Sequence, residues 1–152
     1  MVWVRRTAGG SYCERFISEE ITRVPTFVKC YPLKMKAFYM LQDSPYEFTY
    51  PDGLTKEMRQ TCFNFDLLVP GTGEIVGASQ RENRYEILMA EIVKRGIDPV
   101  PLTWYTDLRR SASTPSFGFG MGIERVKSLL TSTNGDIRNA CPYPVAWKEA
   151  HY

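Results

Sequence analysis

Residues 117 to 125 read Phe117-Gly118-Phe119-Gly120-Met121-Gly122-Ile123-Glu124-Arg125. Glycine at every second position predicts a strand, and the residues after it predict a helix with Arg125 in its first turn. Gly118, Gly120 and Gly122 have no Cβ atom, so a flat aromatic ring can lie against the backbone there. Arg125 would then reach the polyphosphate of the same nucleotide. The stretch therefore indicates a nucleotide site, with a tight strand crossing or a turn before a helix as the competing interpretation.

A second motif lies upstream and reads Phe65-Asp66-Leu67-Leu68-Val69-Pro70-Gly71-Thr72-Gly73-Glu74-Ile75-Val76-Gly77-Ala78-Ser79-Gln80-Arg81-Glu82. The apolar runs on either side of residues 70–73 predict two strands, at residues 61–69 and 74–80, joined by a turn. The glycine-rich stretch resembles motif 3 of the class II aminoacyl-tRNA synthetases. The second segment resembles the matching part of the asparaginyl branch of that family. Two separate motifs thus point to one family.

This resemblance implies a site that activates an amino acid with ATP. In the family, the glycine-rich strand supports adenine and the Arg matching Arg125 meets the terminal phosphate. The Glu matching Glu74 holds Mg²⁺ between phosphates, with the acid matching Asp66 close by, and oxygen ligands suit this ion. The resemblance therefore assigns catalysis to Arg125 and Glu74, and metal binding to Glu74 and Asp66. It assigns ATP binding to Glu74, Gly118, Gly120, Gly122, Ile123, Glu124 and Arg125.

Arg81 is the candidate for recognition of the amino acid. In aspartyl- and asparaginyl-tRNA synthetases the matching Arg grips the oxygen of the substrate side chain. A guanidinium donates equally well to an Asp carboxylate and an Asn carbonyl, so Arg81 alone does not choose between them. Residues 104–110 also resemble the asparaginyl branch, and the context therefore favours asparagine. Strict alternation places Glu74 and Gln80 on one face of a strand and Arg81 on the other, unless the strand bends.

Size and composition limit the class of protein. With 152 residues, 43% of them hydrophobic, the chain can bury one core, so we expect one domain over residues 1–152. The resemblance implies that this domain is part of a class II synthetase catalytic domain. The net charge of +2 is too small to predict nucleic-acid binding by charge alone. The four cysteines form no Cys-x-x-Cys pair, which argues against a zinc site. With no long apolar run and no leader sequence, we expect no membrane span and a cytoplasmic location.

The rest of the chain predicts helices around an antiparallel sheet. Apolar residues recur at helical spacing in residues 13–21, 84–95, 102–109 and 122–130. The last of these helices is expected to bury Val126, Leu129 and Leu130. Hairpin-linked strands followed by helices indicate an α+β fold, and the resemblance specifies the class II synthetase catalytic core.

Three other segments have weaker signals. Aromatic and β-branched runs at residues 26–31 and 37–41 predict a strand hairpin. Residues 42–60 are rich in Asp, Pro, Gly and Thr, which is typical of an inserted loop. Residues 1–12 have little periodicity and predict an irregular start.

The resemblance covers only part of the family's architecture. The anticodon-binding domain, motif 1 of the dimer interface and the motif 2 Arg for the α-phosphate have no counterpart upstream. Ser116 stands where the family usually has His. We expect asparagine as a partner and tRNA only with the absent domains, in a homodimer or with a complementing chain. Three interpretations stay open: part of an asparaginyl-tRNA synthetase, an asparagine synthetase-like paralogue, and a non-catalytic nucleotide- or partner-binding remnant.

Overall fold

A computed structural model describes residues 10–111, 114–131 and 136–144. The chain divides into two compact units. The first unit comprises residues 1–28, 66–77 and 120–152, and the second comprises residues 29–65 and 78–119. The single domain expected over residues 1–152 stays a prediction.

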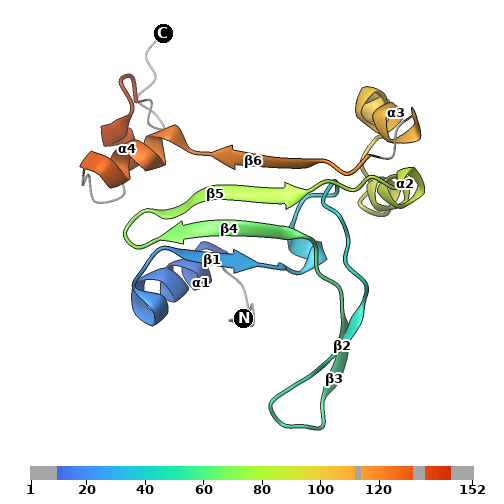
Figure 1. Cartoon of the computed structure of the whole chain (residues 1–152), viewed down its shortest axis with the longest axis horizontal. Coiled ribbons are helices and arrows are strands. Elements are labelled where there is room, and N and C mark those ends of the chain that lie inside the picture. The colour runs from blue at the N-terminus through green and yellow to red at the C-terminus, as the bar shows by residue number, and fades with distance from the viewer. Residues whose placement is uncertain (1–9, 112–113, 132–135, 145–152) are drawn as a thin grey trace. The chain divides into compact units, whose positions relative to one another are not determined.

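The strands β1 (Thr26–Lys29), β4 (Asn64–Val69), β5 (Gly73–Gln80) and β6 (Phe117–Met121) form a sheet in the order β1-β4-β5-β6. Neighbouring strands run in opposite directions (Figure 1). The turn between β4 and β5 is closed by a hydrogen bond from Thr72 N to Val69 O at 3.1 Å. Gly71 and Gly73 both have positive φ in this turn, a conformation that glycine adopts without strain. The expected α+β class with an antiparallel sheet is confirmed.

In the first unit, α1 (Gly10–Phe16) continues into the π-helix η1 (Ile17–Thr22). α4 (Ile123–Thr131) is followed by the short 3-10 helix η4 (Ile137–Ala140). The helix expected at residues 13–21 is confirmed, and residues 10–12 are helical rather than irregular. Residues 1–9 lie outside the described residues. The buried apolar residues of this unit are Ile17, Leu68, Val69 and Ile75.

The prediction that α4 buries Leu129 and Leu130 is wrong. Leu129 and Leu130 are 41% and 78% exposed, and the buried residue of this helix is Ser128. An amphipathic helix buries its apolar side only against another surface. Within the described residues, no such surface covers Leu130.

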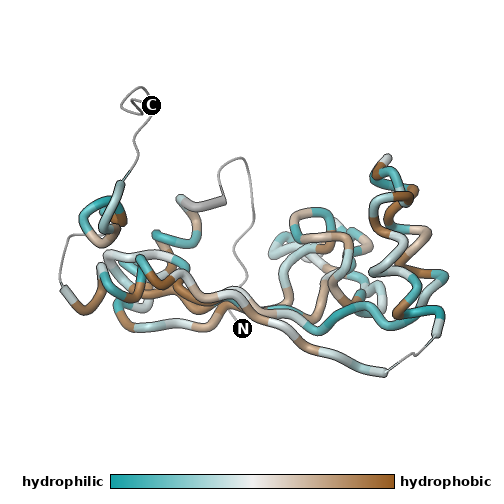
Figure 2. The backbone as a smooth tube through the Cα atoms, turned by 90° about the horizontal axis from the view of Figure 1, so that it is seen from above, coloured by the Kyte–Doolittle hydropathy of each residue, from teal (hydrophilic) through white to brown (hydrophobic). Residues whose placement is uncertain are grey.

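The second unit contains α2 (Tyr85–Lys94), α3 (Thr103–Ser111) and the 3-10 helices η2 (Leu33–Met35) and η3 (Val100–Leu102). Leu88 and Ile92 are spaced by one helical turn on α2 and are fully buried. Gly96 has a φ of 67° just after α2, as expected for a glycine that ends a helix. The helices carry both apolar and polar residues along their turns (Figure 2). Among the described helices, none is long and apolar enough to cross a membrane.

The hairpin expected between residues 26–31 and 37–41 is wrong. Within the second unit, Leu41 instead enters a ring of three backbone hydrogen bonds, each 2.9 Å long: Gln80 N to Phe63 O, Phe63 N to Leu41 O, and Leu41 N to Gln80 O. Met40 also forms an isolated antiparallel bridge with Arg81. Residues 40–42 therefore lie between the segments that continue β4 and β5, and these partners are distant in sequence.

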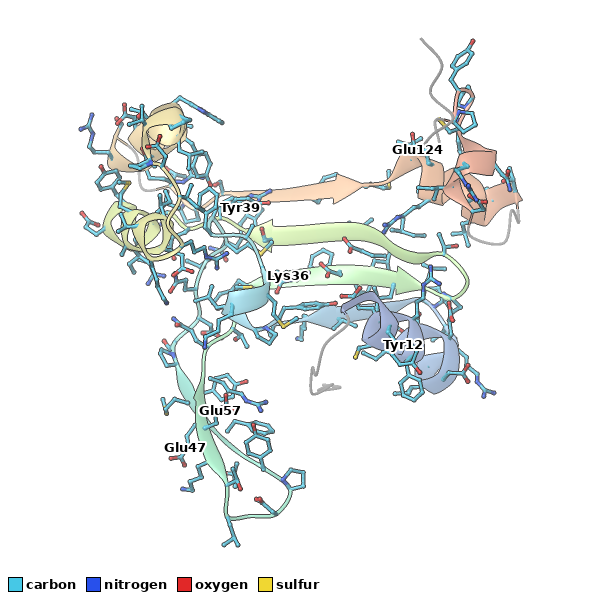
Figure 3. All side chains as sticks on the ribbon, turned by 180° about the vertical axis from the view of Figure 1, so that it is seen from behind. Tyr12, Lys36, Tyr39, Glu47, Glu57 and Glu124 are labelled. Atoms are coloured by element: carbon cyan, nitrogen blue, oxygen red, sulfur yellow. The ribbon has the colours of Figure 1, made fainter. Side chains whose placement is uncertain are left out.

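The loop expected at residues 42–60 is wrong in its secondary structure, because it contains a second, two-stranded sheet. β2 (Tyr46–Thr49) pairs antiparallel with β3 (Lys56–Arg59). Lys56 Nζ lies 2.8 Å from Glu47 Oε1 across the two strands. Arg59 Cζ lies 3.7 Å from the ring centre of Phe48. Cross-strand pairs of this kind stabilise a hairpin whose composition is mostly polar, and Figure 3 labels Glu47 and Glu57 on it.

Candidate functional site

Polar residues occupy positions of β4 where a core strand would carry apolar ones. Asn64, Asp66 and Leu68 alternate with more exposed residues and are all buried. Buried polar groups are unfavourable unless they are satisfied, so such positions indicate a site. Asp66 is 3% exposed and belongs to the first unit.

The carboxylates of Asp66 and Glu74 meet at Gly77 in the first unit. A Cβ atom at Gly77 would lie 2.7 Å from Glu74 Oε1 and 3.5 Å from Asp66 Oδ1. Glu74 and Gly77 are three residues apart, and strict alternation would place their side chains on opposite faces. The Glu74 carboxylate still reaches Gly77, where the missing side chain leaves room for it. The sequence therefore requires glycine here to bring two acids together.

Two convergent carboxylates suit Mg²⁺. This ion prefers oxygen ligands and is commonly held by one or two carboxylates together with water and substrate phosphates. Among the described residues there is no group of three or more His, Cys, Asp or Glu that could hold a metal by itself. Asp66 and Glu74 thus fit an ion that arrives with a phosphate ligand.

Arg125 also lies beside Glu74 in the first unit. Its Nη1 donates a hydrogen bond to the backbone carbonyl oxygen of Glu74. Its Cγ and Cδ atoms lie 3.4 Å from the position a Cβ atom would take on Gly122, so the side chain folds over this glycine. The structure thus brings Arg125 into contact with Glu74, and the roles of both residues toward a nucleotide stay predictions.

Gly120, Ile123 and Glu124, three of the other residues expected around the nucleotide, are open to solvent, whereas Gly118 and Gly122 are half-buried. No atom lies within 4 Å of the Cβ position of Gly120, so the space above this part of β6 is free. Ile123 is 54% exposed, and Glu124 is exposed at the start of α4 (Figure 3). This arrangement is compatible with a flat ring against the backbone at Gly120.

Arg81 lies between an aromatic ring and a glycine within the second unit. Its Cζ atom is 4.5 Å from the ring centre of Tyr39, which Figure 3 labels. A Cβ atom at Gly118 would lie 3.0 Å from Nε and 3.1 Å from Cζ of Arg81, too close to be accommodated without a shift. Arg81 N donates to Ser116 O at 2.8 Å. The guanidinium is therefore placed by a stacking contact and by the absence of a side chain at Gly118.

Glu82, next to Arg81, is fully buried, which the sequence did not indicate. Its Oε1 and Oε2 accept hydrogen bonds from Nε and Nη2 of Arg84 at 2.7 and 2.8 Å, and Oε2 also accepts from Gln42 N at 3.3 Å. Burial acts to raise the pKa of Glu82, but the hydrogen bonds from Arg84 and Gln42 outweigh it and hold the pKa below its ordinary value. Glu82 is thus an ionised, internally bonded carboxylate.

Tyr39 contacts Arg81 without a signal in the sequence, and Ser79 and Asn64 are buried polar residues that the sequence also did not indicate. An aromatic residue in an apolar run, such as Tyr39, predicts core packing and not stacking on a distant Arg. Ser79 and Asn64 are 5% and 6% exposed. Ser79 Oγ and Asn64 Nδ2 have no hydrogen-bond partner among the described residues. Their neighbours Gln80 and Phe63 share a backbone hydrogen bond, so the antiparallel register places Ser79 opposite Asn64.

Comparison with known proteins gives a consistent result. The family model described as tRNA synthetases class II (D, K and N) matches residues 11–146. An asparagine–tRNA ligase of Aliivibrio fischeri is 42% identical over 139 residues, which cover 91% of this chain. The alignment covers 27% of that relative. The chain therefore spans about a quarter of the length of the curated relatives it matches.

Solved structures of similar fold belong to the same family. The Entamoeba histolytica asparaginyl-tRNA synthetase in complex with asparaginyl-adenylate has a TM-score of 0.75 and 35% identity, over 93% of this chain and 29% of that one. The Pyrococcus horikoshii enzyme complexed with asparaginyl-adenylate has a TM-score of 0.69 and 38% identity, over 87% of this chain and 27% of that one.

Proposed function

Because the chain belongs to the class II tRNA synthetases of the D, K and N group, we propose that it carries part of a site that activates asparagine with ATP. The product would be asparaginyl-adenylate, which the complete enzyme would then transfer to tRNA. The relatives of known structure that are complexed with asparaginyl-adenylate support this substrate. The observation that carries the proposal is the Arg81 guanidinium held against Tyr39 and Gly118.

The first unit carries charged side chains that would suit a polyphosphate ligand. Activation joins the carboxylate of an amino acid to the α-phosphate of ATP, and crowding of negative charge makes this step difficult. Arg125 would bind the terminal phosphate through N–H donors other than the one given to Glu74 O. Asp66 and Glu74 would hold Mg²⁺, which neutralises phosphate charge when it is bound. The contribution of these residues is electrostatic stabilisation and orientation of the nucleotide.

In the second unit, Arg81 would recognise the amino acid. Its guanidinium can donate to the carbonyl oxygen of the asparagine side chain, and stacking on Tyr39 fixes the plane from which it donates. The same group would accept aspartate equally well. The preference for asparagine over aspartate therefore rests on the relatives that the chain resembles.

The partners and location follow from this proposal. tRNA would be a partner of the complete enzyme, and the chain would act in a homodimer or with a complementing chain. A cytoplasmic location fits an enzyme of protein synthesis. All three are predictions.

Calorimetric titration of the chain with ATP tests the proposal, in the presence and absence of Mg²⁺ and asparagine. We expect ATP binding that strengthens with Mg²⁺, and asparagine binding that aspartate does not match at equal concentration. If the chain binds ATP but does not bind asparagine, the result would favour the interpretation as a nucleotide-binding remnant. No binding of either ligand to the folded chain would contradict the proposal for this chain.

A further inference from the structure

We propose that Arg109 is a positioning residue for Arg81. The proposal rests on the proposed role of Arg81 in amino-acid binding, but its test does not require that role. Arg109 lies on α3 and makes two hydrogen bonds to different segments of the second unit. Nε donates to Glu82 O at 3.0 Å, and Nη2 donates to Ser116 Oγ at 3.1 Å.

The residues that carry these two acceptors are both joined to the Arg81 backbone. Glu82 directly follows Arg81 at the end of β5, and Ser116 directly precedes β6. Arg81 N itself donates to Ser116 O at 2.8 Å. Arg109 therefore ties the end of β5 to the start of β6 at the point where Arg81 leaves the backbone.

The same ties fix both surfaces that the Arg81 guanidinium contacts. Glu82 N donates to Tyr39 O at 2.8 Å, so Glu82 also fixes the residue whose ring stacks on Arg81. Gly118 is two residues after Ser116 on the extended strand, on the same side of it. If Arg109 releases Glu82 and Ser116, the space between Tyr39 and Gly118 is no longer held at a fixed width.

An arginine is needed for this contact. Its planar fork presents Nε and Nη2 at a fixed separation, whereas a lysine offers one ammonium that cannot bridge two separate acceptors in the same way. Cζ of Arg109 also lies 5.2 Å from the ring centre of Tyr105 on the same helix, which limits its rotation. The acceptor at residue 116 is a side-chain hydroxyl, so it can be removed by Ser116→Ala without changing the backbone.

Side-chain NMR of the whole chain, with ¹⁵N-labelled arginine, tests the proposal. The Nε–Hε signal of Arg81 is assigned by its loss in Arg81→Lys, and its order parameter is then measured in wild type and variants. We expect a rigid signal in wild type and an order parameter below about 0.6 in Arg109→Ala and Arg109→Lys, which is the range of flexible groups. Ser116→Ala removes one of the two hydrogen bonds and should give an intermediate value.

Arg110→Ala is the matched control. Arg110 follows Arg109 on α3, pairs with Asp107 at 3.2 Å and is largely exposed, so its loss removes the same charge without touching Glu82 or Ser116. The Nε of Arg95, bonded to Glu91 at 2.7 Å, serves as a reference inside each sample and should stay rigid.

An unchanged Arg81 order parameter in folded Arg109→Ala would overturn the proposal. If Arg109→Ala does not fold, the Arg81 order parameter is compared between wild type, Ser116→Ala and Arg109→Lys instead. An unchanged value in these two folded variants would likewise overturn the proposal. Asparagine binding is measured on the same samples. A lower Arg81 order parameter in the Arg109 variants would support the positioning role even if the chain binds no asparagine. Absence of asparagine binding would contradict the proposed function, so the two proposals can fail separately.

Discussion

At the scale of single residues, Arg125 gives the most direct test of the nucleotide site. Arg125→Ala should weaken ATP binding by about 1.5 to 3 kcal/mol, because a charged hydrogen bond to phosphate is removed. The free energy of unfolding should change by about 1 kcal/mol or less, since within the chain the substitution removes a hydrogen bond to Glu74 O. Calorimetric titration with ATP and Mg²⁺ measures the first quantity, and urea unfolding measures the second.

Lys127→Ala is the control for this comparison. It removes a cation from the same helix, and its Nζ lies 3.4 Å from Ala140 O rather than near Glu74. Its ATP affinity should equal that of wild type. Equal ATP affinity in Arg125→Ala and wild type would remove Arg125 from the nucleotide site.

Arg81 is the corresponding residue for the amino acid. Arg81→Leu should abolish asparagine-dependent pyrophosphate exchange in a complete or complemented form of the enzyme, and leave ATP affinity unchanged. The loss of a donor to the substrate side chain should cost on the order of 2 to 4 kcal/mol. Gly118→Ala should act in the same direction, because its Cβ would meet the Arg81 guanidinium. Exchange with asparagine at the wild-type rate in Arg81→Leu would contradict the assignment.

Asp66, Glu74 and Arg125 could be named because their segments resemble those of a known family, and their roles stay predictions. The contacts of Glu74 with Arg125 and of its carboxylate with the space at Gly77 had no signal in the sequence. The position of Arg81 could not be derived from alternation, because Arg81 follows the end of β5 and is placed by Tyr39, more than 40 positions upstream. Such long-range packing has no local signal.

At the scale of elements, local signals were sufficient where an element is determined by its own sequence. The turn at residues 70–73, the helix α2 and the glycine-rich β6 were predicted correctly. Residues 37–41 were not, because they bond to Phe63 and Gln80, and pairing with distant partners cannot be read from propensity. The β2–β3 hairpin was missed because Pro45, before β2, and Pro51 and Asp52, in the turn, are typical of loops.

Glu82 links three elements of the second unit, so its ionisation should affect stability. Its pKa in the folded chain is lowered from the ordinary value of 4.5. The unfolded chain therefore binds this proton at higher pH than the folded chain does. The stabilisation is fully present above pH 4.5 and is lost as pH falls through the folded pKa. Urea unfolding at a series of pH values should show this loss.

Glu82→Gln isolates the contribution of this carboxylate. The amide keeps the shape but not the charge, so unfolding free energy near pH 7 should fall by about 1.5 to 3 kcal/mol, the range for a hydrogen bond to a charged group. The decrease in unfolding free energy at acidic pH should also be smaller in the variant than in wild type. Glu57→Gln, on the exposed β2–β3 hairpin, is the control and should change stability little. Identical pH profiles for wild type and Glu82→Gln would contradict the linkage.

At the scale of the whole molecule, large apolar side chains are exposed on the two edge strands of the described sheet. Phe117 and Phe119 on β6 are 75% and 74% exposed, and Phe27 on β1 is 65% exposed. β1 and β6 are the two edge strands of the described sheet. Open strand edges and exposed apolar patches both favour pairing with another chain.

The isolated chain should therefore self-associate or require a partner, and it should not charge tRNA by itself. Sedimentation velocity over a range of concentrations should show oligomers whose fraction rises with concentration. Phe119→Lys places a charge on the edge strand β6 and should lower that fraction, because a buried, unpaired ammonium opposes edge pairing. Leu54→Lys, at the exposed tip of the β2–β3 hairpin, is the control for adding a charge elsewhere and should leave association unchanged. A monomer at all concentrations would show that the exposed strand edges need no partner. Formation of asparaginyl-tRNA by the purified chain alone would show that the residues of this chain suffice for tRNA charging.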